Sequence, residues 1–241
     1  MTSRIERRAL ITGASSGIGK ATALAFAKAG IDVALVSRSQ DKLEVVANAA
    51  LEIGVKAKAY VLDLAKIEEV KAGISAIAAD FAPIDILVNN AGMGYTNPLV
   101  ETPLSDWQRV INLNLTSVFQ CILGILPAMR AQQRGTIINV ASIAGQQPFP
   151  DWGAYSVSKA GLIALSKTLA AEERNHGIRV VSISPGAVNT SLWDTDTVKA
   201  DLNRSAMLTP EIVAQSILHT ALLPEQAVIE SVTLMPSAGA L

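Results

Sequence analysis

The sequence predicts an α/β fold in which helices cover both faces of one parallel β-sheet. Short apolar runs alternate with longer helical segments along the whole chain, the pattern of strands joined by right-handed crossover helices. The length of 241 residues suits one domain, and a hydrophobic content of 50% is enough for a large core. We therefore expect a single domain over residues 1–241.

Composition narrows the class of partner. The net charge is −1 and no basic stripe stands out, which argues against nucleic acid as a partner. The N-terminus lacks an apolar signal core, and no apolar run is expected to reach transmembrane length, so we expect a soluble cytoplasmic protein with no membrane partner. Cys121 is expected to be a buried, inert thiol, and His176 and His219 lack metal-ligand spacing, so no metal site is predicted.

The first predicted strand, Ala9–Thr12, runs into a glycine-rich turn over residues 13–19 and then a helix over Lys20–Ala29. Glycines in such a turn let backbone N–H groups approach a pyrophosphate, and the helix N-terminus adds a favourable dipole. The spacing is G-x-x-x-G-x-G, which differs from the commoner G-x-G-x-x-G. The order strand, glycine turn, helix still favours dinucleotide binding.

The second predicted strand, Ile31–Val36, indicates which cofactor is bound. An acidic residue near this point usually holds the adenosine ribose of NAD. Here Ser37 and Arg38 offer a hydroxyl and a guanidinium instead, which suit a 2′-phosphate through charge-assisted hydrogen bonds. The pattern predicts NADP(H), and the alternative is that Arg38 is an ordinary surface charge.

A helix over Asp41–Ile53 and a strand over Lys56–Leu62 are expected next. Asp63 follows the strand directly. It could accept a hydrogen bond from the adenine amino group, or it could N-cap the helix predicted over Lys66–Asp80. The residues alone leave both interpretations open.

The fourth predicted strand, Ile84–Val88, opens into Asn89–Gly92, where small residues suit close approach to a ligand. A long helix is expected over Pro103–Ala131. Asparagine inside a helix is mildly unfavourable, so Asn114 is expected to hold a helix distortion or a bound water; a plain polar position is the alternative.

The fifth predicted strand, Thr136–Val140, places Ser142 where open α/β sheets bind ligands. The helix predicted over Ala154–Arg174 carries Tyr155 and Lys159, which lie four residues apart and share one helix face. An ammonium beside a phenol lowers the phenol pKa from about 10, which suits proton transfer to ketones and alcohols. Taken alone, the pair is also what an ordinary exposed helix face presents.

The last strands are predicted over Ile178–Ser184 and Val228–Leu234. Between them, residues 191–209 have mixed polarity and are expected to form a mobile cover over the cleft. Thr209 is expected to N-cap the final helix, with Pro210 at its first position.

Together these residues resemble the short-chain dehydrogenase/reductase family over nearly the whole chain. Residues 12–19 are similar to its T-G-x-x-x-G-x-G loop, and residues 89–92 to its N-N-A-G element. The resemblance implies a Rossmann-type three-layer αβα sandwich with a seven-stranded parallel sheet. It also implies a homotetramer, or a dimer.

The resemblance further implies a catalytic tetrad. Ser142 and Tyr155 would hydrogen-bond the substrate carbonyl oxygen, and Tyr155 would give it a proton while the nicotinamide C4 delivers a hydride. Lys159 would bind the nicotinamide ribose and lower the Tyr155 pKa. Asn114 would hold a water in a proton relay from Lys159.

The same resemblance assigns the NADP(H)-binding residues and favours adenine binding for Asp63. They follow the ends of successive strands and are Gly13, Ser15, Ser16, Gly17, Ile18, Gly19, Ser37, Arg38, Asp63, Leu64, Asn89, Ala91, Gly92, Tyr155, Lys159, Pro185, Gly186, Val188 and Thr190.

The expected substrate is a small-molecule carbonyl compound, an apolar ketone or aldehyde that NADPH reduces. The loop before Tyr155 is bulky, and the ending over residues 234–239 departs from the family's usual H-V-N-G-G. An apolar pocket is predicted with the lining Met93, Tyr95, Phe149, Trp152, Leu192 and Trp193; the other interpretation is that several of them only pack in the core or in the cover. The alternatives are reduction of a 3-oxoacyl-[acyl-carrier-protein] or 3-oxoacyl-CoA and, from another class, a non-catalytic NADP(H)-binding regulator.

Overall fold

A computed structural model describes residues 7–200 and 203–239 of the chain. Its centre is a seven-stranded, fully parallel sheet of order β3-β2-β1-β4-β5-β6-β7, which confirms the predicted fold class. The strands are β1 (Arg8–Thr12), β2 (Asp32–Ser37), β3 (Ala57–Val61), β4 (Ile86–Asn89), β5 (Gly135–Val140), β6 (Ile178–Pro185) and β7 (Ser231–Leu234).

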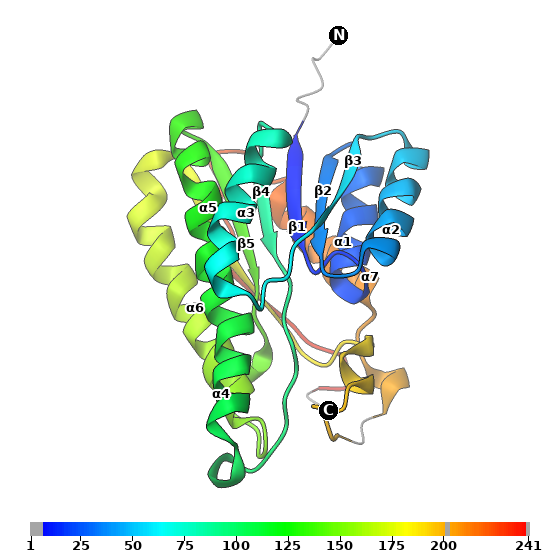
Figure 1. The fold of residues 1–241 in the computed structure, drawn as a ribbon, viewed down its shortest axis with the longest axis vertical. Helices are drawn as coiled ribbons and strands as arrows, with labels where there is room; N and C mark the ends of the chain where they lie inside the picture. The colour runs from blue at the N-terminus through cyan, green and yellow to red at the C-terminus, as the bar shows by residue number, and fades with distance from the viewer. Residues whose placement is uncertain (1–6, 201–202, 240–241) are drawn as a thin grey trace.

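Helices cover both faces of this sheet, as Figure 1 shows. The seven α-helices are α1 (Gly17–Lys28), α2 (Gln40–Ile53), α3 (Ile67–Asp80), α4 (Leu104–Ile111), α5 (Ser117–Gln132), α6 (Gly153–Glu173) and α7 (Pro210–Ala221). One buried core joins the sheet to α1, α2 and α7, and the other joins it to α3, α5 and α6. The three-layer sandwich expected from the sequence is therefore present.

The strand order reverses beside β1, whose two neighbours are β2 and β4. Because all strands are parallel, their carboxyl ends lie at one edge of the sheet. Loops that leave β1 and β4 on opposite sides of such a switch point open a crevice between them, which is where open α/β sheets bind ligands. This topology places the predicted functional residues along one edge.

Helices α4 and α5 form one continuous helical run over Leu104–Gln132, joined by the π-helical turn Asn112–Thr116. By length and composition alone, its 29 residues could cross a membrane, so the expectation that no apolar run reaches that length was wrong. Half of its most apolar window is buried in the fold, and α5 packs against α3. It is a core helix.

Two capping predictions have opposite outcomes. Thr209 caps α7, because its Oγ1 accepts a hydrogen bond of 3.4 Å from the Ile212 N–H. Asp63 does not cap α3, because the N-cap residue of that helix is Lys66. The Asp63 Oδ1 instead accepts a hydrogen bond of 3.0 Å from the Ala65 N–H, which closes the turn after β3. Residues 201–202 of the predicted cover and the last two residues, 240–241, lie outside the described part of the chain.

Candidate active site

A cleft of about 920 Å³ follows the carboxyl edge of the sheet. This volume lies within the range of small-molecule and cofactor sites. Most of the residues predicted from the sequence line it: Gly13, Ser15, Ser16, Gly17, Ile18, Ser37, Arg38, Asp63, Leu64, Ala91, Gly92, Ser142, Tyr155, Lys159, Pro185, Gly186, Val188 and Thr190. Gly19, Asn89 and Asn114 are not among the lining residues.

The glycine-rich turn makes one wall of the cleft. Gly13 and Gly17 have φ angles of +65° and +51°, which L-residues with side chains rarely adopt. A Cβ on Gly19 would lie 2.2 Å from the Gly13 carbonyl oxygen, so Gly19 supports the turn from behind rather than lining the cleft. Among the described contacts the Ser16 side chain does not cap α1, which leaves the helix N-terminus available to an anion.

The structure places the two asparagines at the end of β4 differently from the prediction: Asn89, the last residue of the strand, does not line the cleft, and Asn90, which follows it, does. Asn89 is 1% exposed, and its Nδ2 donates to Asn139 Oδ1 at 2.8 Å inside the core. Asn90 lines the cleft instead, and its Nδ2 donates to the Thr12 carbonyl oxygen at 3.0 Å, which joins β4 to β1. The Asn89 side chain therefore points into the core and away from the cleft, and its contact with the cofactor stays a prediction.

The basic end of the cleft lies beside β2. Arg38 is exposed at this point and lines the cleft with Ser37. Lys42, in the first turn of α2, also lines it, although the sequence interpretation did not single this residue out. Its place in the first turn of the helix that directly follows Ser37 and Arg38 is the signal that could have identified it, because that turn begins at the end of β2.

Asn114 lies in the π-helical turn, so the predicted helix distortion is confirmed. Its Oδ1 accepts from the Met93 N–H at 2.8 Å, and its Nδ2 donates to the Met93 carbonyl at 2.9 Å and to Ser158 Oγ at 3.1 Å. Ser158 in turn donates to the Tyr155 carbonyl at 2.6 Å. The Asn114 amide thus braces the loop after β4 against the start of α6, and its water-holding role stays a prediction.

Tyr155 and Lys159 face the cleft from the first turns of α6. Lys159 is 5% exposed, and its Nζ donates to the Val140 carbonyl at 2.9 Å. Burial lowers the pKa of Lys159 to about 8, because an ammonium loses its hydration there. Ser142 begins the turn after β5, where its Oγ accepts from the Ala144 N–H at 3.1 Å.

The net shift of the Tyr155 pKa is upward, opposite in direction to the lowering expected from Lys159. Burial raises the pKa of the Tyr155 phenol, and the opposing effect comes from the Ser142 side chain. The Lys159 Nζ lies 5.7 Å from the centre of the Tyr155 ring. Desolvation of the phenol is the larger effect on this pKa in the protein alone, and the lowering by Lys159 stays a prediction.

Aromatic side chains form the substrate end of the cleft. The Trp152 ring packs edge-on against Tyr155, with centroids 5.2 Å apart, and against Trp193, with centroids 5.7 Å apart. Five of the six predicted pocket residues line the cleft: Met93, Phe149, Trp152, Leu192 and Trp193. The exception is Tyr95, which packs with Val110 in a small core, and its hydroxyl donates to Asp106 Oδ2 at 3.0 Å.

The predicted cover lies against the segment that follows β4. The Thr96 N–H donates to the Thr197 carbonyl at 2.8 Å, and the Lys199 N–H donates to Thr96 Oγ1 at 2.7 Å. Residues 192–197 and Ala200 line the cleft, so the segment does border the expected substrate. Its mobility stays a prediction.

The donor types in the cleft suit a dinucleotide. The described residues contain no group of three or more His, Cys, Asp or Glu side chains that could hold a metal ion. The bare start of α1 and the turn at Gly13 and Gly17 fit a pyrophosphate, and the cations at Arg38 and Lys42 fit a further phosphate. Fold and cleft together define a protein of the dinucleotide-binding α/β class.

Comparison with known proteins narrows this class. The family model described as short chain dehydrogenase matches residues 7–200. The chain is 38% identical over 248 residues to a 3-oxoacyl-[acyl-carrier-protein] reductase of Synechocystis sp., covering 99% of this chain and 98% of the relative. The chain therefore belongs to the short-chain dehydrogenase family, and it is an oxidoreductase acting on alcohol or carbonyl groups.

Solved structures agree with this assignment. An alcohol dehydrogenase from the archaeon Thermococcus sibiricus, complexed with 5-hydroxy-NADP, superposes with a TM-score of 0.89 at 28% identity over 98% of this chain and 99% of that one. A metagenomic short-chain oxidoreductase in complex with NADP gives a TM-score of 0.83 at 32% identity, over 96% and 97% of the two chains.

Proposed function

We propose that the protein is an NADPH-dependent reductase that converts an apolar ketone or aldehyde into an alcohol. The observation that carries the proposal is the meeting of Ser142, Tyr155 and Lys159 in one cleft, across the sheet's switch point from Arg38. A hydroxyl donor, a proton donor and a buried cation at one place are what carbonyl reduction requires.

Each side chain has a role that its position supports. Burial keeps Tyr155 protonated at neutral pH, so its phenol can give a proton to the carbonyl oxygen as negative charge develops there. The Ser142 hydroxyl adds a second hydrogen bond to that oxygen. Lys159 is placed to bind the nicotinamide ribose and to supply positive charge near the phenol. Bound NADPH supplies the hydride.

NADPH rather than NADH is supported by the residues around the end of β2. Ser37 stands where an acidic residue would favour NAD, and Arg38 and Lys42 place two positive charges beside it. Two of the solved relatives are described with forms of NADP bound. All six further residues line the cleft, and with NADPH bound Asp63 and Leu64 would border the adenine, Ala91 and Gly92 the ribose, and Val188 and Thr190 the carboxamide.

Reduction of 3-oxoacyl thioesters is the second candidate. Its support is the Synechocystis relative, which is described as a 3-oxoacyl-[acyl-carrier-protein] reductase and matches almost the full length of both chains. The aromatic side chains Trp152 and Trp193 favour the apolar ketone, since they place large rings rather than small residues beside Tyr155.

A homo-oligomer through α5 and α6, a tetramer or a dimer, is part of the proposal. Phe119 on α5 and Val157 on α6 are large apolar side chains that are 42% and 47% exposed, and contact with a second copy would remove them from water.

The experiment follows NADPH consumption by absorbance with a panel of aryl ketones, alkyl ketones and a 3-oxoacyl thioester. Higher kcat/KM for the ketones supports the main proposal, and higher kcat/KM for the thioester supports the second candidate. Tight NADPH binding with no turnover across the panel would make the protein a non-catalytic regulator and overturn both.

A further inference from the structure

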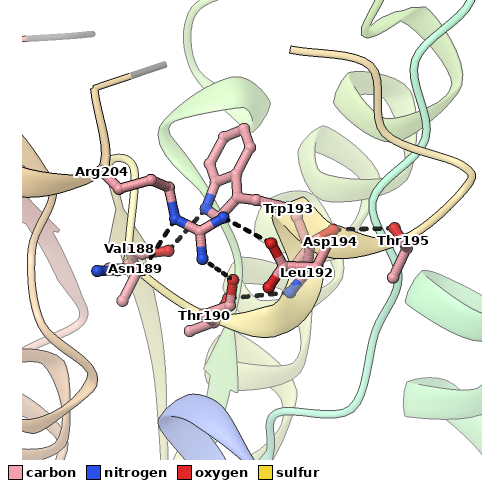
Figure 2. Close-up of polar contacts among 8 residues, drawn as sticks. All are labelled: Val188, Asn189, Thr190, Leu192, Trp193, Asp194, Thr195 and Arg204. Atoms are coloured by element: carbon pink, nitrogen blue, oxygen red, sulfur yellow. Dashed lines mark hydrogen bonds and ion pairs between the residues drawn. The ribbon is translucent and has the colours of Figure 1, made fainter. Parts of the chain in front are cut away.

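Arg204 lies in the short helical turn Arg204–Ala206 and reaches back across the cover of the cleft. Figure 2 shows its guanidinium in the middle of a cluster of polar contacts. Its Nε donates to Asn189 Oδ1 at 2.9 Å, its Nη1 to Asp194 Oδ1 at 3.0 Å, and its Nη2 to the Thr190 carbonyl oxygen at 2.9 Å. One side chain therefore ties together the segment that borders the nicotinamide and substrate end.

The segment held by Arg204 also has bonds of its own. The Trp193 indole Nε1 donates to the Val188 carbonyl at 2.7 Å, and the Leu192 N–H donates to Thr190 Oγ1 at 3.4 Å (Figure 2). These bonds fold the chain into a compact turn, but they all lie within residues 188–193. The start of this turn is fastened to a later part of the chain by a β-bridge between Val188 and Leu208, in which the Asn189 N–H donates to the Leu208 carbonyl at 2.8 Å. Arg204 fastens the remainder of the turn, at Thr190 and Asp194.

The turn sets the position of Trp193, and the effect extends to the proposed proton donor. Trp193 packs edge-on against Trp152, and Trp152 packs edge-on against Tyr155. A shift of the turn at Asp194 would therefore move the wall beside Tyr155. Arg204 does not line the cleft, so any influence on the reaction passes through these neighbours.

Geometry matters more than charge in this cluster. The Arg204 and Asp194 side chains are 37% and 64% exposed, and an ion pair of that exposure contributes little because solvent screens it. The other two acceptors, on Asn189 and Thr190, are neutral oxygens. A planar guanidinium can address all three acceptors at once, whereas the rotating ammonium of lysine cannot hold three fixed directions.

We propose that Arg204 is a positioning residue that fixes Thr190 and Trp193 for cofactor and ketone binding; this rests on the proposed reductase function. Without the Arg204 guanidinium, the part of the turn over residues 190–194 loses its bonds to the later segment, while the bridge of Val188 to Leu208 remains. The nicotinamide end and the substrate wall are then held less firmly. The effect falls on binding, hence on KM, more than on kcat once both ligands are seated.

The experiment compares Arg204→Met, Arg204→Lys and a control, Arg174→Met, which removes another exposed ion pair, the 3.8 Å contact of Arg174 with Glu230. Calorimetry gives the Kd of NADP⁺, ketone assays give KM and kcat, and thermal unfolding gives Tm. We expect Kd and KM to rise about three- to tenfold in Arg204→Met, which is the size of effect that the loss of one or two hydrogen bonds produces. The change in kcat should be smaller. Arg174→Met should match the wild type.

Arg204→Lys separates geometry from charge. The proposal predicts that Arg204→Lys keeps most of the rise in Kd and KM seen in Arg204→Met. Wild-type constants in Arg204→Lys would show that only the charge of Arg204 matters and would overturn the proposal. An unchanged Kd and KM in Arg204→Met would overturn it as well. If Arg204→Met fails to fold, Asn189→Ala removes one acceptor and must raise the same constants to a smaller degree. Should the wild type reduce no ketone, the proposed function fails, and the NADP⁺ Kd still decides the role of Arg204.

Discussion

The ammonium nitrogen of Lys159 lies 5.7 Å from the centre of the Tyr155 ring, and in the wall of the cleft Lys159 is buried and Tyr155 partly buried. The Lys159 Nζ donates to the Val140 carbonyl, and no ion pair among the described residues includes Lys159. Burial in the fold therefore raises the pKa of the Tyr155 phenol, which favours its neutral form, and lowers the pKa of Lys159, which disfavours its charged form. This relationship leads to the first two predictions.

Lys159→Met should make the protein without cofactor more stable at pH 7. Burial lowers the pKa of Lys159 from 10.5 to about 8, so charging this group destabilises the folded state by about 3 kcal/mol below that pH. Losing the bond to Val140 offsets about 1 kcal/mol of the gain. Between pH 8 and 10.5 the unfolded chain holds the proton and the folded chain does not, so wild-type stability rises and the difference shrinks. Urea unfolding at pH 7 and at high pH measures both; a variant less stable at pH 7 would contradict this account.

Ketone reduction should be insensitive to pH through neutrality and fall on the alkaline side. The raised pKa of Tyr155 keeps its proton available, while Lys159 loses its positive charge as the pH passes about 8. The reverse oxidation needs the deprotonated phenol and should increase with pH. Profiles of kcat/KM in both directions, with the same cofactor pair, measure this. Reduction that speeds up steadily at alkaline pH would exclude Tyr155 as the donor.

Replacing Ser37 with Asp and Arg38 with Leu should shift the preference from NADPH towards NADH. The change adds a carboxylate for a ribose and removes a guanidinium from the cleft. Loss of charge-assisted bonds predicts a fall of about 10- to 100-fold in the ratio of kcat/KM for NADPH over NADH. Lys42→Met should move the ratio the same way by less, and Lys28→Met, away from the cleft, should leave it unchanged. An unmoved ratio in the double variant would refute the assignment.

Arg130→Met should destabilise the fold by more than the loss of an exposed ion pair does, because it leaves the buried Glu173 carboxylate without its partner. Glu173 on α6 is fully buried and accepts from the Arg130 Nε on α5 at 2.8 Å. Its hydrogen bond with Arg130 lowers the Glu173 pKa, so the stabilisation is present above the unfolded pKa and is lost as the pH falls through the folded one. Urea unfolding at pH 7 and below pH 4 measures this, and the exposed pair Lys66–Glu69 gives the control variant Lys66→Met. A loss no larger than the control's would contradict the prediction.

The strands, the sheet and most cleft-lining positions could be predicted because local pattern determines them. Alternating apolar runs place the strands, and Asn114 inside a long helix indicated the distortion that the structure shows. Asn89 and Asn90 could not be told apart, because one residue of register decides which of them points into the core. Arg204 could not be found, because its three acceptors lie 10 to 15 residues earlier in the chain and meet it only in the folded cover.

The pKa of Tyr155 shows where sequence reasoning ends. Spacing places Lys159 near the phenol, but whether charge or burial dominates depends on how completely the cleft walls exclude water. Tyr95 was placed in the pocket for a similar reason, because the sequence does not show that its bond to Asp106 turns it into a small core.

The most direct measurement of the central claim is the turnover of Tyr155→Phe with its NADPH affinity determined in parallel. The variant keeps the ring that packs on Trp152 and removes only the hydroxyl. We predict an NADPH Kd within about twofold of the wild type and a fall in kcat of at least about 10²–10³ for ketone reduction, the typical effect of removing one donor to a developing oxyanion. Ketone reduction at a rate near that of the wild type would contradict the role of Tyr155 as proton donor.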